Sequence, residues 1–249
     1  MGGRGSGKND VSRYGNYLGG DGIQKRISFL KEGIEANQHV LDHAELKPTE
    51  RRSIEIYLEN LKAELNELDS KVGLAKQLLG SKGRPMSIED AVIGANPNFS
   101  KGTKEWLENC QRCVIAYELR RRGYNVEATA YEGWDDTARG WKEAFYEMSP
   151  VKVGSSDREK VIKNIYKQME KWGEGSRAIV DLDWSRTKGH VFNAEFKNGK
   201  LILMEAQKGN YADWDKYSQH MMPTKTTLWR VDNLEPTEKI VGLIKRKGE

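Results

Sequence analysis

The sequence has little of what several common protein classes require. Only two of its 249 residues are cysteines, Cys110 and Cys113. Two cysteines within one helical turn cannot form the disulfide framework of a small secreted domain, so their use must be chemical, metal-binding or incidental. No apolar run approaches the length of a membrane span. With 41 basic and 37 acidic residues, the formal net charge of +4 does not mark a dedicated nucleic-acid binder.

The composition that remains is that of a folded chain of one or two domains. Hydrophobic residues make up 37% of the sequence and include seven Trp, which is enough for a sizeable core. Residues 1–20 are rich in glycine and lack the apolar segment of a signal peptide. We therefore expect a disordered N-terminus and no cleaved secretion signal.

Residues 21–80 carry the pattern of a helical hairpin. Apolar residues recur at helical spacing until Lys47-Pro48 interrupts them. A second stretch then alternates spacings of four and three, at Ile54, Leu58, Leu61, Leu65, Leu68, Val72, Ala75 and Leu79. This heptad seam predicts an antiparallel coiled-coil arm that serves as a spacer or oligomerisation element. Residues 81–86 are the expected linker to a second domain at 87–249.

Asn109 and Cys110 mark the start of a helix in that second domain. Asn is a good N-cap, and a thiol in the first helical turn lies among unpaired N–H groups that carry partial positive charge. Cys110 is therefore biased towards the thiolate, and Cys113 lies one turn further on. Gly123 is placed to end the helix, and the preceding arginines at 120–122 are interpreted as its solvated end.

Alternating apolar and polar residues after position 177 predict an antiparallel sheet. The runs are 178–184, 190–196, 201–205 and 227–231. Asn198-Gly199 lies between the second and third runs, and this dipeptide specifies a two-residue type I′ hairpin turn.

The register set by that turn brings a histidine and a carboxylate together. It pairs Phe192 with Glu205 and His190 with Gln207. Because alternate residues share a face, His190, Glu205 and Gln207 project to one side, with Glu205 within reach of His190. A cysteine at a helix start, then a histidine, then a carboxylate is the order of papain-like enzymes, in which the thiol is the nucleophile and the imidazole its base.

Four segments carry a closer resemblance. They are Asn109-Cys110-Gln111-Arg112-Cys113, Arg120-Arg121-Arg122-Gly123-Tyr124-Asn125-Val126, Gly189-His190-Val191-Phe192-Asn193 and Glu205-Ala206-Gln207-Lys208-Gly209. Together they resemble the papain-fold toxin family called Tox-PL, over roughly residues 86 to 245. That family comprises predicted protein-glutamine deamidases that occur in polymorphic toxins and on bacteriophage minor head proteins.

The resemblance implies an α+β papain-like domain in which the catalytic helix packs on an antiparallel sheet. It implies that one of the two cysteines is the nucleophile, and the helix position favours Cys110 over Cys113. His190 would be the base and Glu205 the orienting acid, at a position where the family usually has Asp-Pro-Gln. Candidates for binding the oxyanion or substrate are Asn109, Gln111, Gln207 and the backbone N–H groups of the helix start.

The implied reaction is conversion of a protein glutamine to glutamate through a thioester. A papain-like protease would use the same groups, and a non-enzymatic phage head or virion protein is the alternative from another class. Cys-x-x-Cys is also half of a zinc site or a redox pair, but the sequence has no second cysteine pair. We therefore expect neither a metal nor a cofactor.

The expected partners follow from the same resemblance. The substrate would be a protein that presents a Gln side chain, and the arm at 21–80 would mediate self-association or contact with a phage particle. We expect localisation in the bacterial cytoplasm or in a virion.

Overall fold

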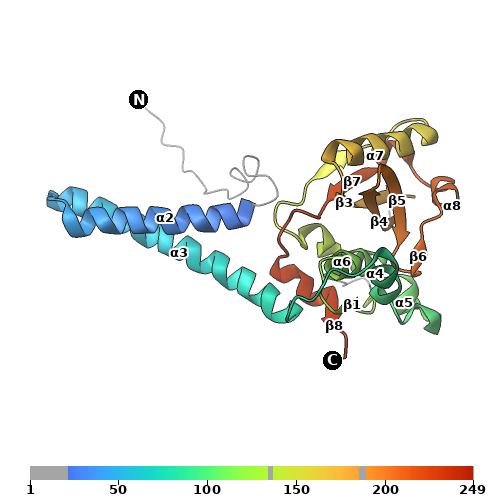
Figure 1. Ribbon diagram of the computed structural model, residues 1–249, viewed down its shortest axis with the longest axis horizontal. Helices are drawn as coiled ribbons and strands as arrows, with labels where there is room; N and C mark the ends of the chain where they lie inside the picture. Colours follow the sequence, from blue (N-terminus) through green and yellow to red (C-terminus); the bar gives the residue numbers. More distant parts are fainter. Residues whose placement is uncertain (1–21, 134–136, 185–188, 249) are drawn as a thin grey trace.

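The computed structural model describes residues 22–133, 137–184 and 189–248 (Figure 1). The expected disordered N-terminus at 1–20 lies outside the described residues. The described chain consists of a long helical arm and a globular part in which helices cover both faces of a sheet.

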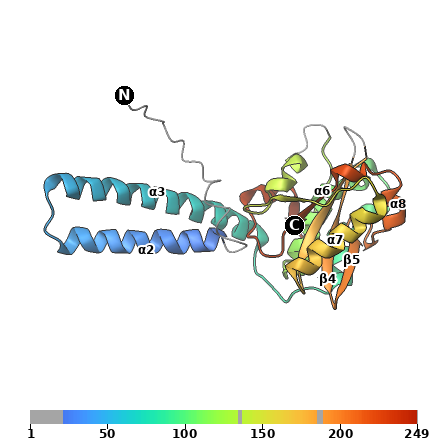
Figure 2. The same cartoon turned by 90° about the horizontal axis from the view of Figure 1, so that it is seen from above.

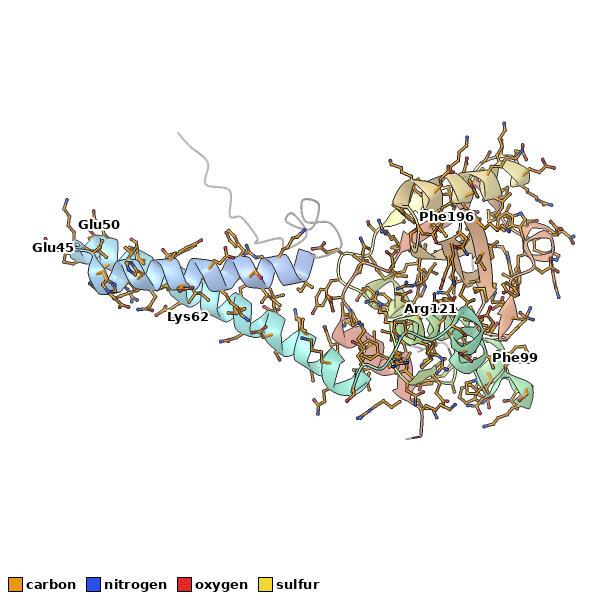
Figure 3. All side chains as sticks on the ribbon, viewed as in Figure 1. Glu45, Glu50, Lys62, Phe99, Arg121 and Phe196 are labelled. Carbon is orange, nitrogen blue, oxygen red and sulfur yellow. The ribbon has the colours of Figure 1, made fainter. Side chains whose placement is uncertain are left out.

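The arm consists of α2 (Gly22–His43) and α3 (Pro48–Leu79), which run antiparallel (Figure 2). Leu30 and Leu61 are buried in the seam between them. Beside the seam, Arg26 donates to Glu64 through Nε and Nη2, both at 2.7 Å. Charged residues of the arm such as Glu45, Glu50 and Lys62 lie far from the globular part (Figure 3). None of the described helices combines the length and apolar character needed to cross a membrane.

The C-terminal end of α3 belongs to the core of the globular part. Ala75 and Leu79 are buried in the same cluster as Ile88. In the expected linker at 81–86, the N–H of Gly83 donates to the carbonyl of Gly123 at 2.9 Å. The segment is therefore held against the end of the helix that begins at Cys110.

The globular part combines short helices with a six-stranded antiparallel sheet in the order β2-β7-β3-β4-β5-β6. Its helices are α4 (Ile88–Ala95), α5 (Lys104–Leu107), α6 (Cys110–Arg121), α7 (Arg158–Trp172) and α8 (Trp214–Ser218). The sheet strands are β2 (Pro150–Lys152), β3 (Arg177–Asp183), β4 (Gly189–Lys197), β5 (Lys200–Glu205), β6 (Asn210–Tyr211) and β7 (Thr227–Arg230). A two-stranded sheet joins β1 (Val126–Ala128) to β8 (Ile244–Arg246), and the 3-10 helices are η1 (Phe99–Lys101), η2 (Thr137–Glu143), η3 (Pro223–Lys225) and η4 (Glu238–Gly242). This arrangement fits the expected α+β class.

The two faces of β4 belong to two different cores. Phe192 and Ala194 join the cluster that contains Ile165 of α7. Val191 belongs to the cluster that contains Ile115 of α6. Because successive strand residues point to opposite faces, one strand contacts the helix that carries the cysteines and also the helix on the other face of the sheet.

The turn between β4 and β5 has the predicted form. Asn198 and Gly199 have φ values of 53° and 69°, as a type I′ turn requires, and Phe196 pairs with Leu201. The pairing between β4 and β5 ends at Asn193 and Met204, so the predicted pairs of Phe192 with Glu205 and of His190 with Gln207 are wrong. The reason is a turn at Glu205, whose carbonyl accepts from the N–H of Gly209 at 2.9 Å.

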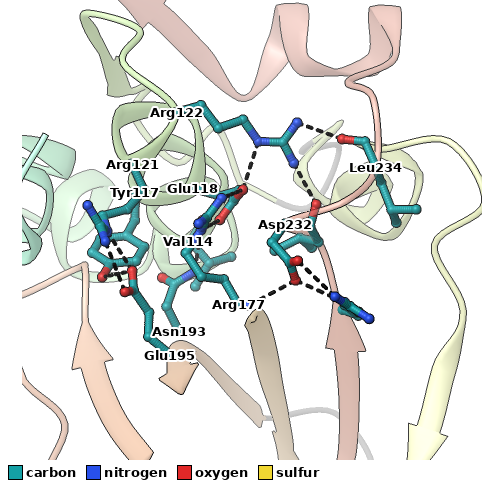
Figure 4. Close-up of polar contacts among 12 residues, drawn as sticks. Val114, Tyr117, Glu118, Arg121, Arg122, Arg177, Asn193, Glu195, Asp232 and Leu234 are labelled. Atoms are coloured by element: carbon teal, nitrogen blue, oxygen red, sulfur yellow. Dashed lines mark hydrogen bonds and ion pairs between the residues drawn. The ribbon is translucent and has the colours of Figure 1, made fainter. Parts of the chain in front are cut away.

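The interpretation of the arginines at 120–122 as a solvated helix end is also wrong. Buried carboxylates draw two of them inward: Arg121 Nε donates to Glu195 Oε1 at 2.6 Å, and Arg122 Nε donates to Glu118 Oε1 at 2.7 Å (Figure 4). Arg177 of β3 donates to both oxygens of the same Glu118.

Candidate active site

The ion pairs of Figure 4 fix α6 on the sheet. Burial raises the pKa of Glu118, but Arg122 and Arg177 outweigh burial and leave this pKa below its ordinary value. Glu118 is therefore ionised, and its partners come from α6 itself and from β3. Glu195 of β4 is bonded in the same way by Arg121 and by the hydroxyl of Tyr117. This network holds the helix that begins at Cys110 against the strand that contains His190.

Cys110 is the first residue of α6, and its side chain is half-buried. Asn109 occupies the N-cap position, as predicted, but its side chain makes no capping hydrogen bond. In the described part of the chain, the backbone N–H groups of Cys110 and Gln111 have no acceptor. Unpaired N–H groups at a helix start can stabilise a developing negative charge beside the sulfur.

The Asn109 side chain takes part in a buried network of amide hydrogen bonds. Its Oδ1 accepts from Asn96 Nδ2 at 3.1 Å and from Gln207 Nε2 at 3.4 Å. Its Nδ2 donates to the carbonyl of Thr129 at 3.1 Å. Of the three side chains predicted to bind oxyanion or substrate, Asn109 and Gln207 thus hold α6 in place. Gln111 is half-buried, and its side chain makes no hydrogen bond within the described residues.

His190 and Glu205 form a buried pair beside Cys110. His190 Nε2 lies 2.6 Å from Glu205 Oε2, and only 7% of His190 and 1% of Glu205 is exposed. The Cys110 thiol lies close enough to the imidazole for hydrogen bonding and charge to raise the pKa of His190. Because Nε2 faces Glu205, Nδ1 is the nitrogen left for the sulfur. The predicted nucleophile, base and orienting acid are therefore adjacent, although they come from α6, β4 and β5.

The surroundings of His190 favour its charged form. Burial lowers the pKa of His190, but hydrogen bonds and charge interactions with Cys110 and Glu205 outweigh burial and raise this pKa to about 10. Glu205 shifts the other way: burial raises its pKa, while His190, Tyr217 and Lys208 together lower it. An imidazolium held between a carboxylate and a sulfur is the arrangement that stabilises a thiolate nucleophile.

Cys113 lies in a different environment. It is fully buried, and its Sγ donates to Asn109 Oδ1 at 3.2 Å. Burial raises the pKa of the Cys113 thiol well above its ordinary value. A buried neutral thiol is a poor nucleophile, so the geometry favours Cys110 over Cys113.

Three residues of the site were not predicted as site residues, although Lys208 lies in the Glu205–Gly209 segment. The Tyr217 hydroxyl donates to Glu205 Oε2, and Lys208 Nζ donates to Tyr217 Oη at 2.8 Å. The Trp184 ring stacks on His190 with 5.5 Å between centroids. Trp184 directly follows β3, which pairs with the strand of His190, and that pairing was the one available signal. No local pattern connects Tyr217, on the short helix α8, with the site.

The described ranges 22–133, 137–184 and 189–248 contain no cluster of three or more His, Cys, Asp or Glu side chains able to hold a metal ion. The two histidines of the arm, His39 and His43, stack on each other along α2.

We compared the sequence with models of known protein families, with curated proteins and with solved structures. Residues 108–210 match the family model described as papain fold toxin 1, glutamine deamidase. The matched segment contains Cys110, His190 and Glu205 and ends before α8. No curated protein and no solved structure matches the chain. Residues 108–210 are therefore similar to the papain-fold toxin family of glutamine deamidases, the Tox-PL family that the sequence resembles.

Proposed function

We propose that this protein is a cysteine-dependent protein-glutamine deamidase, acting as a toxin or effector domain of phage or mobile-element origin. Cys110 is the nucleophile, His190 transfers protons and Glu205 orients His190. The observation that carries the proposal is the contact of His190 with both the Cys110 thiol and the Glu205 carboxylate. The family match over 108–210 supports the same reaction.

The proposed reaction has two halves. The Cys110 thiolate adds to the carboxamide carbon of a substrate Gln, and the N–H groups of Cys110 and Gln111 stabilise the oxyanion. His190 protonates the leaving nitrogen, ammonia departs and a thioester remains. His190 then takes a proton from water, whose hydroxide cleaves the thioester and restores the thiol. The sum is glutamine and water converted to glutamate and ammonia.

A peptidase would use the same three groups, because peptide and side-chain amides differ only in what is attached to the nitrogen. The family description favours the side-chain amide. Peptides that each contain a single Gln separate the two reactions. Deamidation adds about 1 Da to the intact peptide, whereas peptide-bond hydrolysis divides it.

The test exposes such peptides and a cell lysate to the purified protein, followed by mass spectrometry. We expect Gln sites that gain about 1 Da with the wild type and none with Cys110→Ala. Cys113→Ala is the matched control, because it removes the other thiol and is expected to retain the conversion. Cleaved peptides would instead identify a peptidase. Unmodified substrates together with an unreactive Cys110 would contradict the deamidase proposal and favour the non-enzymatic virion protein.

We further propose that the arm at 21–80 mediates self-association. Phe29, Ile56 and Tyr57 lie on the arm with 45% or more of their surface exposed. Light scattering of the wild type and of Phe29→Ser with Tyr57→Ser tests this proposal. A monomeric wild type would contradict self-association and leave a phage-particle component as the candidate partner.

A further inference from the structure

The Glu205 carboxylate receives more hydrogen bonds than the pair with His190 requires. Its Oε2 accepts from His190 Nε2 at 2.6 Å and also from the Tyr217 hydroxyl. Its Oε1 accepts from the N–H of Gln207 at 3.2 Å. The carboxylate, which is 1% exposed, thus accepts from three donors.

Tyr217 is built into the site from outside the family segment at 108–210. It lies on α8, is 5% exposed, and its ring centroid is 4.8 Å from that of His190. Asp213 is the N-cap of α8, and its Oδ1 accepts from the N–H of Lys216 at 3.0 Å. A capped helix and a stacked ring therefore determine where the Tyr217 hydroxyl points.

Lys208 extends the chain of hydrogen bonds to the surface. Its Nζ donates to Tyr217 Oη at 2.8 Å and lies 5.1 Å from the centroid of the Tyr217 ring. An ammonium bonded to a phenol oxygen makes the phenol O–H a stronger donor. Burial, followed by the charge of Glu205, raises the pKa of Tyr217, so the phenol keeps the proton that it donates.

These contacts restrict the greater flexibility that a glutamate side chain has at this position compared with an aspartate. A Glu side chain has one more rotatable bond than Asp, so holding its carboxylate against an imidazole costs more conformational entropy. A second donor on Oε2 limits the orientations that the carboxylate can take. A displacement of about 1 Å at a catalytic group can cost about a hundredfold in rate.

We propose that Tyr217 is a positioning residue that holds Glu205 against His190, and that Lys208 strengthens the Tyr217 hydrogen bond. The inference rests on the proposed function, because it assigns Tyr217 and Lys208 a role in the same reaction. Neither residue touches the substrate in this proposal; both act through Glu205.

The test compares Tyr217→Phe with Tyr166→Phe. Tyr166 is the matched control, because its hydroxyl donates to the carbonyl of Gly199 at 3.2 Å, in the turn between β4 and β5. The measurement is the rate of Cys110 alkylation by iodoacetamide between about pH 4 and about pH 9, with the site identified by peptide mapping.

Loss of the Tyr217 donor raises the pKa of Glu205, so the carboxylate becomes protonated at a higher pH as the solution is acidified. The acidic limb of the alkylation profile is therefore expected to move upwards by about one pH unit in Tyr217→Phe. Tyr166→Phe is expected to keep the wild-type profile. With a deamidation substrate, kcat is expected to fall about tenfold in Tyr217→Phe while KM changes little.

Two further measurements cover a loss of stability in Tyr217→Phe. Lys208→Met changes an exposed residue and keeps the phenol, and we expect its acidic limb to move the same way by a smaller amount. Proton NMR follows the hydrogen between His190 Nε2 and Glu205 independently of the thiol. We expect its resonance to shift in Tyr217→Phe and not in Tyr166→Phe.

The outcomes separate this inference from the proposed function. A reactive Cys110 whose profile and NMR resonance are the same in both Tyr variants would overturn the role of Tyr217 and leave the deamidase proposal standing. An unreactive Cys110 in the wild type, with a resonance that still responds to Tyr217→Phe, would support the positioning of Glu205 and overturn the proposed nucleophile.

Discussion

Replacing His190 by alanine tests the candidate site most directly, because the imidazole contacts both the thiol and the carboxylate. Interactions with Cys110 and Glu205 outweigh burial and raise the pKa of His190 to about 10. A folded-state pKa above the ordinary value means that the imidazolium is present at neutral pH and is lost only as the pH rises through about 10. The wild type is therefore expected to react with alkylating agents at mildly acidic pH.

The size of the effect follows from thiol ionisation. An ordinary thiol, with a reference pKa of about 8.5, is ionised to only about 0.3% at about pH 6. The upper bound on the decrease in reactivity, set by comparing a full thiolate with an ordinary thiol, is therefore about 300-fold. A more basic thiolate is intrinsically more nucleophilic, with a Brønsted slope of about 0.4–0.5, and this offsets part of the loss. We expect a net decrease of at least about tenfold at about pH 6, which disappears above about pH 9.

The assay is alkylation of Cys110 by iodoacetamide across this pH range. His220→Ala is the matched control, since His220 is exposed and has no contact with Glu205 within the described residues. A His190→Ala protein that is alkylated at about pH 6 as fast as the wild type would refute the argument. Such a result would mean that the imidazole does not support the thiolate.

Three further predictions concern stability. Glu118→Gln leaves Arg122 and Arg177 without their buried counter-charge, so we expect about 3–5 kcal/mol less stability in urea unfolding at neutral pH. Because the pKa of Glu118 is lowered, this difference should shrink as the pH falls through that pKa, and a neutral-pH loss below about 1 kcal/mol would contradict the network. Cys113→Ala should cost roughly 1–2 kcal/mol in the same assay and keep Cys110 reactive; loss of that reactivity would reopen Cys113 as the nucleophile. Gly199→Ala places a side chain at a φ of 69° and should lower stability by about 1 kcal/mol, whereas an unchanged urea midpoint would speak against the type I′ turn.

Local sequence signals predicted the local structure well. Asn198-Gly199 set the turn and the register of the residues next to it, because a two-residue turn with positive φ at both positions permits only one pairing. The start of α6 at Cys110 was likewise predicted correctly, with Asn109 at the N-cap position, although its side chain makes no capping hydrogen bond. Both features depend on backbone conformations that neighbouring residues determine.

The hydrogen-bond and ion-pair partners of the polar side chains were decided by the tertiary structure. Asn109 was predicted to cap the helix with its side chain. Instead, Asn96 and Gln207, from other segments of the chain, donate hydrogen bonds to its Oδ1. The arginines at 120–122 were predicted to be a solvated helix end. The carboxylates that pair with two of them, Glu118 of α6 and Glu195 of β4, could not be recognised as their partners from the sequence. A sequence pattern shows which residues are charged and how they are spaced, but it does not show which of them become buried. A buried charge needs a partner of opposite charge, because burial without one is costly.

The sequence by itself determined the helical arm pattern, the α+β class, the hairpin turn and the chemical identity of the candidate groups Cys110, His190 and Glu205. Only the tertiary structure decided which thiol meets the imidazole and which further donors reach the carboxylate. Tyr217 shows the reason. Its hydroxyl reaches Glu205 because α8 packs beside β4 and β5, and contacts between elements that are distant in sequence arise from packing of the whole fold rather than from any local pattern.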